Sequence, residues 1–134
     1  MFYLDTNTCI YFLNGRYKSV RGEILGTSPS EITISSIVKA ELLLGAYKSK
    51  QREANLEKVE RFLEPFKIQA FDDQAAYEYA NIRYECESRG QLVGPNDLFI
   101  AAIVRYNNGV LVTNNIREFG RIPGLKLENW TEEH

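Results

Sequence analysis

The prediction of the fold class starts from the stretch FYLDTNTCIYFL, residues 2–13. Its first three residues, FYL, form a short apolar run typical of a buried strand, and the run ends at Asp5. Thr6 or Asn7 can cap the apolar helix that follows. A buried strand that leads through a carboxylate directly into a helix is the opening of a βαβ unit, and such units build parallel sheets.

The rest of the chain alternates between strand and helix patterns in the same way. Further strands are predicted at residues 31–35, 67–71, 110–113 and 125–127. The spacing of apolar residues predicts helices over 35–49, over 56–63 up to Pro65, from Asp72 or Asp73 to near Gly90, and from Asp97 to near Asn108. These alternating elements favour an α/β fold, in which a parallel sheet of about five strands is covered by helices on both faces.

Length and composition favour one ordinary globular domain. The chain has 134 residues, enough to bury a core within a single domain over residues 1–134, and 44% of them are hydrophobic. The apolar runs are far too short to span a bilayer, and the N-terminus lacks the basic start of a signal peptide. Cys9 and Cys86 lack metal-site spacing, which favours reduced thiols in a cytoplasmic protein.

The histidine content and the net charge limit the classes of catalytic and binding chemistry that are expected of this chain. The only histidine, His134, is the last residue, so nucleophile–histidine and histidine–metal chemistries are not expected. A net charge of −2 gives no support for general affinity for nucleic acid, which a strongly basic domain would have. If the chain is an enzyme, carboxylates and a metal ion are expected to carry its chemistry.

Acidic and amide side chains stand beside three of the predicted strands. Asp5 follows the first strand, and Glu41 lies near the start of the helix after the second. Asp97, in VGPNDLFIAA, opens the helix that leads into the fourth strand, and Asn115 and Glu118 follow that strand. In open parallel sheets, ligands bind beyond the carboxyl ends of the strands, where the strand order reverses. These side chains converge there if the first and fourth strands are neighbours.

A cluster of carboxylates points to a hard cation. Carboxylates that share one pocket repel each other, so some must take up protons unless a counter-charge is present. Mg²⁺ and Mn²⁺ prefer such oxygen ligands, whereas zinc prefers histidine and cysteine. A cation held in this way lowers the pKa of a bound water and offsets charge on a phosphate group, so hydrolysis of phosphodiesters is the reaction class that this pattern favours.

Each of these residues also has an ordinary structural explanation. Asp5 can cap a strand end, Asp97 can complement the dipole of its helix, and Glu41 can lie on the polar side of an amphipathic helix. Asn115 suits a turn. A phosphatase resembling the haloacid dehalogenases, with Asp5 as nucleophile, is another alternative, but that class needs a second Asp two residues later, where this chain has Asn7.

Four motifs in order resemble one known family. They are LDTN at residues 4–7, ISS at 34–36 followed by AELLLGA at 40–46, VGPNDLFIAA at 93–102, and LVTNNIREFGRIPGLKLENW at 111–130. Together, from Leu4 to Trp130, they resemble the PIN-domain family and, more narrowly, the VapC toxins of VapBC toxin–antitoxin pairs. The resemblance implies a Rossmann-like, three-layer α/β/α fold and an endoribonuclease toxin that depends on Mg²⁺ or Mn²⁺.

The resemblance also implies roles for particular residues. The acidic site of the family falls on Asp5, Glu41 and Asp97, with Asp5 and Asp97 as metal ligands. Many relatives carry a further Asp where this chain has Asn115, so Glu118 is predicted to be the fourth acid. Three polar residues are predicted to support the site: Asn7, Thr113 and Asn115.

The substrate and partners are expectations of the same kind. The residues of the last two motifs resemble those of the family branch that cuts initiator tRNA in the anticodon stem-loop. The candidates for contact with the RNA backbone are Arg16, Lys18, Lys48, Lys50 and Arg117. A VapB-type antitoxin is expected to cover the active site, and a homodimer is expected through apolar positions in helices 37–47 and 56–63, unless these positions are core. The alternative, favoured by Asn115, is a catalytically impaired PIN-like module that binds RNA or protein.

Overall fold

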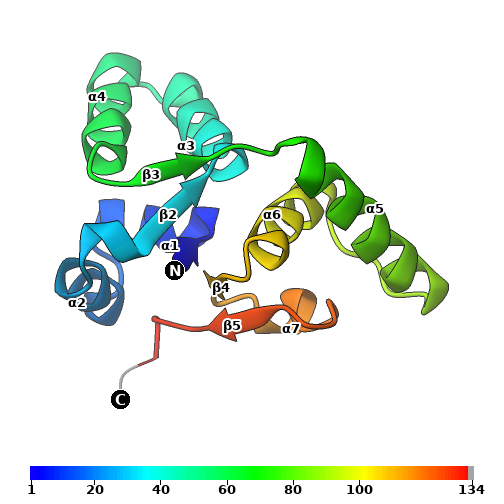
Figure 1. Cartoon of the computed structure of the whole chain (residues 1–134). Coiled ribbons are helices and arrows are strands. Elements are labelled where there is room, and N and C mark those ends of the chain that lie inside the picture. Colours follow the sequence, from blue (N-terminus) through cyan, green and yellow to red (C-terminus); the bar gives the residue numbers. More distant parts are fainter. Residues whose placement is uncertain (133–134) are drawn as a thin grey trace.

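The computed structural model describes residues 1–132, and Figure 1 shows the order of their elements along the chain. The strands are β1 (Phe2–Leu4), β2 (Ile32–Ser35), β3 (Lys67–Gln69), β4 (Val110–Val112) and β5 (Lys126–Glu128). The helices are α1 (Thr6–Asn14), α2 (Lys18–Gly26), α3 (Ser36–Lys48), α4 (Arg52–Leu63), α5 (Asp73–Ser88), α6 (Pro95–Tyr106) and α7 (Ile116–Phe119), and a 3-10 turn covers Pro29–Glu31.

The five strands form one parallel sheet in the order β3-β2-β1-β4-β5. Phe2 is in register with Ile32 on one side and with Val110 on the other, so β1 lies between β2 and β4. The chain builds outward from β1 to β3 and then returns to add β4 on the opposite side. The strand order therefore reverses between β1 and β4, as the predicted site required.

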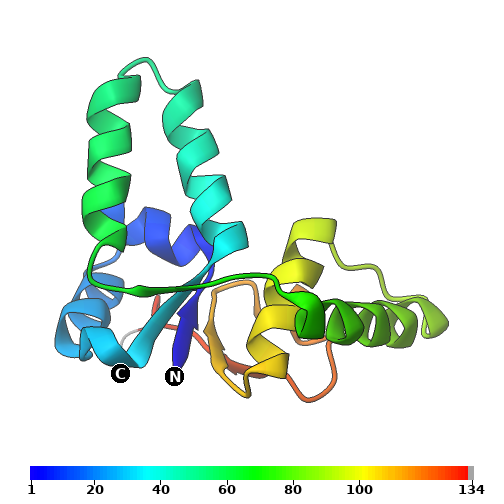
Figure 2. The same ribbon diagram turned by 45° about the horizontal axis from the view of Figure 1, so that its top comes forward.

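Two groups of helices cover the sheet (Figures 1 and 2). Helices α1 to α4 connect strands that progress in one direction along the sheet, whereas α5, α6 and α7 connect strands that progress in the other. Since parallel crossovers are right-handed, the two groups belong on opposite faces. This arrangement confirms the predicted α/β/α layers.

Helix α6 is apolar because it is the most deeply buried helix. Its residues 100–104 are each no more than 2% exposed. The central strands facing the helices are equally buried, as Leu4, Leu111 and Val112 show. A strand covered on both faces needs a continuous apolar run rather than an alternating one, which is why FYL and VLV are short apolar runs.

The helix starts correct one prediction. Asp5, rather than Thr6 or Asn7, is the N-cap of α1, because its Oδ1 accepts the Thr8 backbone N–H at 2.9 Å. Asp72 caps α5 in the same way, with Oδ1 2.9 Å from the Ala75 nitrogen. Thus the residue that closes the first strand also opens the first helix.

Two helices were not predicted, α2 and α7. Helix α2 buries only Val20 and Ile24 and contains Gly22, so its apolar stripe is two residues long and its intrinsic helix propensity is low. Helix α7 is a single turn of four residues, too short for any periodic pattern.

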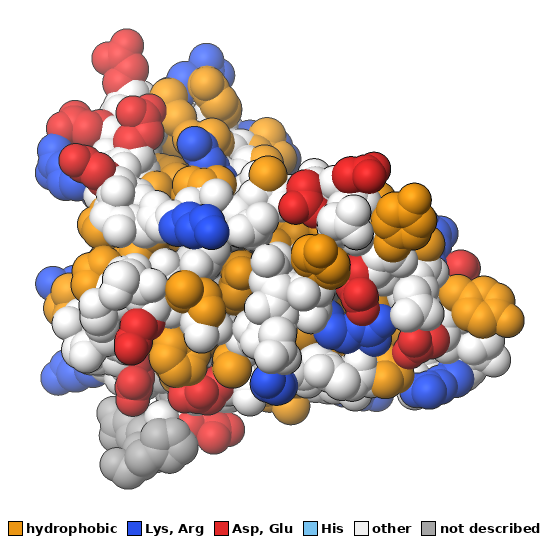
Figure 3. All heavy atoms as spheres, viewed as in Figure 1, with side chains coloured by type: hydrophobic (Ala, Val, Ile, Leu, Met, Phe, Trp, Pro, Cys, Tyr) orange, Lys and Arg blue, Asp and Glu red, His pale blue; other side chains and the backbone are white. Residues whose placement is uncertain are grey.

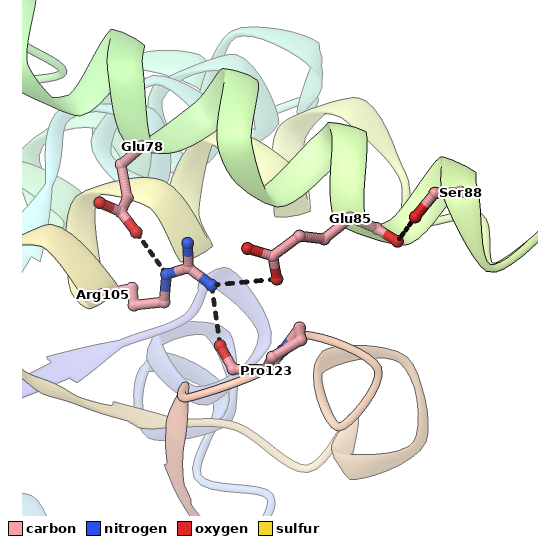
Figure 4. A network of polar contacts seen from close by, with 5 residues as sticks. All are labelled: Glu78, Glu85, Ser88, Arg105 and Pro123. Carbon is pink, nitrogen blue, oxygen red and sulfur yellow. Dashed lines mark hydrogen bonds and ion pairs between the residues drawn. The ribbon is translucent and has the colours of Figure 1, made fainter.

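Arg105, in the last turn of α6, ties three segments together (Figure 4). Its guanidinium contacts Glu78 of α5, lies 3.8 Å from Glu85 Oε2 of the same helix, and donates to the Pro123 carbonyl at 2.8 Å. The side chain is 15% exposed, so water screens these contacts only partly. Arg105 thereby fixes α5 and the segment before β5 against α6.

Two expectations about the chain as a whole can be compared with the described residues. Cys9 and Cys86 are both buried and unpaired, as expected for reduced thiols. Between Met1 and Glu132, no helix combines the length and apolarity needed to cross a membrane.

Candidate active site

Asp5 stands at the carboxyl end of the central strand β1. Its backbone N–H donates to the Val112 carbonyl at 3.1 Å, which extends the pairing with β4 by one residue. The side chain is only 5% exposed. Burial raises the Asp5 carboxyl pKa, although hydrogen bonds from Thr113 and Thr8 work in the opposite direction. A carboxylate that is buried and held by hydrogen bonds at the end of a strand is suited to bind a cation.

Glu41 comes from α3, six residues after β2 ends at Ser35. Ser35 caps this helix by accepting the Val38 N–H at 3.2 Å, so the helix starts directly at the sheet edge. The Thr6 hydroxyl donates to Glu41 Oε1 at 3.0 Å. This bond joins the first turn of α1 to α3 and holds the Glu41 carboxylate toward Asp5.

Asp97 lies in the first turn of α6, three residues after the N-cap Gly94. Burial is the main reason that its pKa rises to about 6, and the negative charges of Glu118, Glu41 and Asp5 raise it further. The helix N-terminus, which favours an ionised carboxylate, does not offset this repulsion. Asp97 therefore lies in the electrostatic field of the other three acids.

Glu118 approaches the same place from α7. Its Oε1 accepts the Gly94 backbone N–H at 2.7 Å, and its Oε2 accepts the Asn115 amide at 2.9 Å. The bond from Gly94 is the main cause that lowers the Glu118 pKa. A β-carbon at Gly94 would lie 3.6 Å from Glu118 Oε1 and 3.7 Å from Asp97 Oδ2, so both carboxylates stand beside the same backbone position.

These side chains surround a small pocket of about 110 Å³. Its lining consists of Asp5, Thr6, Asn7, Glu41, Asp97, Asn115 and Phe119. The structure thus brings three of the four predicted acids into the pocket lining, and the fourth, Glu118, is bonded to one lining residue, Asn115. Thr113 lies behind them, 1% exposed, and its hydroxyl accepts the Asn115 N–H at 2.9 Å.

The donor set fits a hard divalent cation. All of the charged side chains that line the pocket are carboxylates, and the negative charges of the neighbouring acids add to burial in raising the Asp97 pKa. Within residues 1–132, no group of three Asp, Glu, His or Cys side chains is arranged so that the three together could hold a metal ion. Mg²⁺ does not require three such side chains, because it is commonly bound through one or two carboxylates and retains several waters.

The predicted RNA-binding residues divide into two groups around the site. Arg16 packs over the ring of Tyr11, 5.5 Å from its centroid, and the Tyr11 hydroxyl accepts the Asn114 amide at 3.0 Å. Arg117 is exposed on α7, next in sequence to the site residue at 118. These two basic residues are therefore linked to the segment that follows β4.

The remaining basic candidates lie farther from the pocket or on surface where acidic and basic side chains are interspersed. Lys48 and Lys50 lie where α3 turns into α4, about 10 Å along the helix from Glu41, and this turn points away from the sheet (Figure 2). Lys18 is exposed at the start of α2. Acidic and basic side chains are interspersed on the face in Figure 3, so this face carries no broad basic patch.

Three contributors were not predicted from the sequence. They are the Gly94 backbone N–H that binds Glu118, the Thr6 hydroxyl that binds Glu41, and the ring of Phe119 in the pocket wall. The role of Thr6 could have been predicted, because Thr6 is a polar residue directly after Asp5. A backbone N–H has no residue-type signal at all.

Fold and site together define the class: an α/β domain with a carboxylate-lined pocket at the point where a parallel sheet reverses its order. The model of the PIN domain family matches residues 2–125. The chain belongs to the PIN domain family.

Similar proteins within this family are VapC ribonucleases. The chain is 44% identical to "Ribonuclease VapC2" of Rickettsia felis, covering 97% of this chain and 98% of that protein. It is 43% identical to "tRNA(fMet)-specific endonuclease VapC" of Salmonella typhimurium, covering 96% and 97%. The crystal structure of DNA-bound VapBC from Salmonella typhimurium superposes with a TM-score of 0.91 at 43% identity, covering 96% of this chain and 97% of the solved chain.

Proposed function

We propose that this chain is an endoribonuclease toxin of the VapC kind, which hydrolyses phosphodiester bonds of RNA with the help of Mg²⁺ or Mn²⁺. The observation that carries the proposal is the convergence of Asp5, Glu41 and Asp97 on one pocket, with Glu118 beside it. Two similar proteins are named for cleavage of initiator tRNA, at 43% and 39% identity, which supports initiator tRNA as the substrate.

Each acid has a distinct part in this proposal. When bound, the cation supplies a Lewis acid that activates water and offsets charge on the phosphate. Asp5, at the end of β1, and Asp97, in the first turn of α6, are the residues that would hold it, and both line the pocket. Thr6 orients Glu41 through its 3.0 Å hydrogen bond, and Glu41 and Glu118 are placed to complete the coordination or to orient water.

The test is cleavage of total tRNA by the purified chain, freed of any antitoxin, with Mg²⁺ and with EDTA. We expect one discrete product that appears only with Mg²⁺ and carries a 5′-phosphate and a 3′-hydroxyl. A 2′,3′-cyclic phosphate would instead mean attack by the ribose 2′-hydroxyl and would overturn the mechanism. A folded chain that neither cleaves RNA nor binds Mn²⁺ would favour the impaired binding module.

A VapB-type antitoxin is the proposed protein partner. Solved structures of similar chains are VapBC complexes, from Rickettsia felis at 43% identity and from Haemophilus influenzae at 32%. This chain has an apolar groove of about 450 Å³ between α1, α2 and α4, whose walls include Phe12, Ile24 and Phe62. Its basic lining residues are Arg21, Lys58 and Arg61. The groove therefore suits an amphipathic helix that carries acidic residues beside its apolar face.

Leu25 allows the groove to be tested without disturbing the core, because its side chain lines the groove and is 64% exposed. L25E is expected to weaken binding of a VapB-type antitoxin at least about tenfold, since a charge would be buried against an apolar helix. Isothermal titration calorimetry measures the change. Tyr84, 74% exposed on α5, provides the control Y84E. Equal affinities for L25E and Y84E would place the partner elsewhere.

The homodimer remains a prediction. Of the apolar positions expected at the interface, Val59, Phe62 and Leu63 of α4 are buried in the core. Leu44 and Tyr47 of α3 are 52% and 50% exposed, so they are the positions still free for a second copy. The mass of the chain in solution, measured by light scattering for the wild type and for L44E, tests this proposal.

A further inference from the structure

Asn115 makes hydrogen bonds from its backbone and from both atoms of its side-chain amide. Its backbone N–H donates to the buried Thr113 hydroxyl at 2.9 Å, which fixes the residue at the end of β4. Its Oδ1 accepts the Glu118 backbone N–H at 3.4 Å, as the N-cap of α7. Its Nδ2 donates to Glu118 Oε2 at 2.9 Å. The same amide therefore holds the backbone and the carboxylate of Glu118.

The other oxygen of Glu118 satisfies the start of α6. Gly94 is the N-cap of this helix and has no side chain, and its N–H donates to Glu118 Oε1 at 2.7 Å. In a capping box, the side chain of the third helical residue makes this bond. The third residue of α6 is Asp97. Because Glu118 occupies the Gly94 N–H from outside the helix, this N–H does not take up the Asp97 carboxylate, which lines the pocket and lies within hydrogen-bonding reach of the Glu118 carboxylate.

We propose that Asn115 is a positioning residue, which locks the Glu118 carboxylate onto the Gly94 N–H so that Asp97 faces the pocket. This inference rests on the proposed function. An aspartate at position 115 has the same shape but no N–H to donate, and it would set one carboxylate against another at 2.9 Å. Asn115 and Glu118 are therefore a matched donor–acceptor pair.

The test is a double-mutant cycle with N115D, E118Q and the N115D/E118Q double variant. E118Q alone places two amide donors against each other. The double variant exchanges the carboxylate and the amide, so it restores both the donor–acceptor contact and the number of carboxylates. Two quantities are measured: the Mn²⁺ dissociation constant by electron paramagnetic resonance, and kcat and KM for RNA cleavage. Urea unfolding of the metal-free variants reports the contact itself.

We expect the effect of N115D to depend on residue 118 by a factor of about ten or more, in both Mn²⁺ affinity and kcat. N115D should be harmful beside Glu118 and restorative beside the glutamine of E118Q, with KM little changed. Asn114 supplies the matched control, since it is adjacent and donates to the Tyr11 hydroxyl instead. N114D should combine with E118Q by simple multiplication.

The outcomes separate this inference from the proposed function. A wild-type chain that binds Mn²⁺ and cleaves RNA, but in which N115D and E118Q multiply independently, would overturn the positioning role alone. Coupling in urea unfolding without coupling in Mn²⁺ affinity or kcat would reduce the contact to a structural one and also overturn it. A wild-type chain that neither binds Mn²⁺ nor cleaves RNA would overturn the proposed function and, with it, this inference.

Discussion

Replacing Asp5 with asparagine is expected to lower RNA cleavage about a thousandfold while leaving the fold stable. The amide oxygen of D5N can still accept the Thr8 N–H that caps α1, now 2.9 Å from Asp5 Oδ1. The variant loses the negative charge, which burial already disfavours since the Asp5 pKa is raised, and one of the two oxygens that accept from Thr8 and Thr113 becomes an amide donor. Activity and urea stability, measured on the same preparation, should therefore separate.

Two further variants control this experiment. D5A removes the cap as well as the charge, so it should lose about 1 kcal/mol of stability in addition to activity. D72N changes the matched cap of α5, which binds the Ala75 N–H at 2.9 Å and lies outside the pocket lining, and it should leave cleavage unchanged. Cleavage by D5N within threefold of the wild type would contradict the role given to Asp5.

Replacing Asp97 with asparagine is expected to have two opposite effects, lost cleavage and a more stable metal-free fold. Cleavage should fall about a thousandfold, because the cation loses a charged ligand. Folding raises the Asp97 pKa from 3.8 to about 6. The ionised carboxylate therefore destabilises the fold, and D97N should gain about 1–2 kcal/mol at pH 8 after allowance for partial exposure to solvent.

The contribution of Asp97 to the free energy of unfolding changes with pH in a direction that follows from its raised pKa. The protonated Asp97 carboxyl favours the fold, so its contribution is fully present below the unfolded pKa of 3.8 and is lost as pH rises through about 6. The stability difference between D97N and wild type should thus grow from pH 4 to pH 7 in EDTA and shrink when Mg²⁺ is added. D73N, which makes the same substitution in the first turn of α5 and outside the pocket lining, is measured beside it as the control. A constant difference across this range would contradict the shared electrostatic site.

Much of the fold could be predicted from the sequence because the buried strands have a simple signature. Runs such as FYL and VLV are apolar along their whole length, since helices cover both faces of the sheet, and their positions set the alternation with helices. The acids could be placed at strand ends for the same reason. Their convergence could not, because it depends on β1 and β4 being neighbours, a property of strand order and not of local pattern.

The structural features that were not predicted depend on few side chains whose residue type or spacing is recognisable in the sequence. The bond between Glu118 and the Gly94 N–H joins residues 24 positions apart through a backbone group. The groove between α1, α2 and α4 depends on α2, whose two buried residues gave too little periodicity to be noticed. Asp5 was read as a strand-end residue with Thr6 or Asn7 as the cap, although one carboxylate serves as both the cap and the predicted ligand.

The central claim is that the carboxylates at the strand reversal bind a divalent cation, and Mn²⁺ titration followed by electron paramagnetic resonance tests it most directly. The antitoxin-free chain at pH 7.5 is titrated beside D5N, D97N and D72N. We predict saturable binding for the wild type and D72N, and affinity at least about tenfold weaker for D5N and D97N. Equal affinity in all four proteins, or no binding by the folded wild type, would contradict the account.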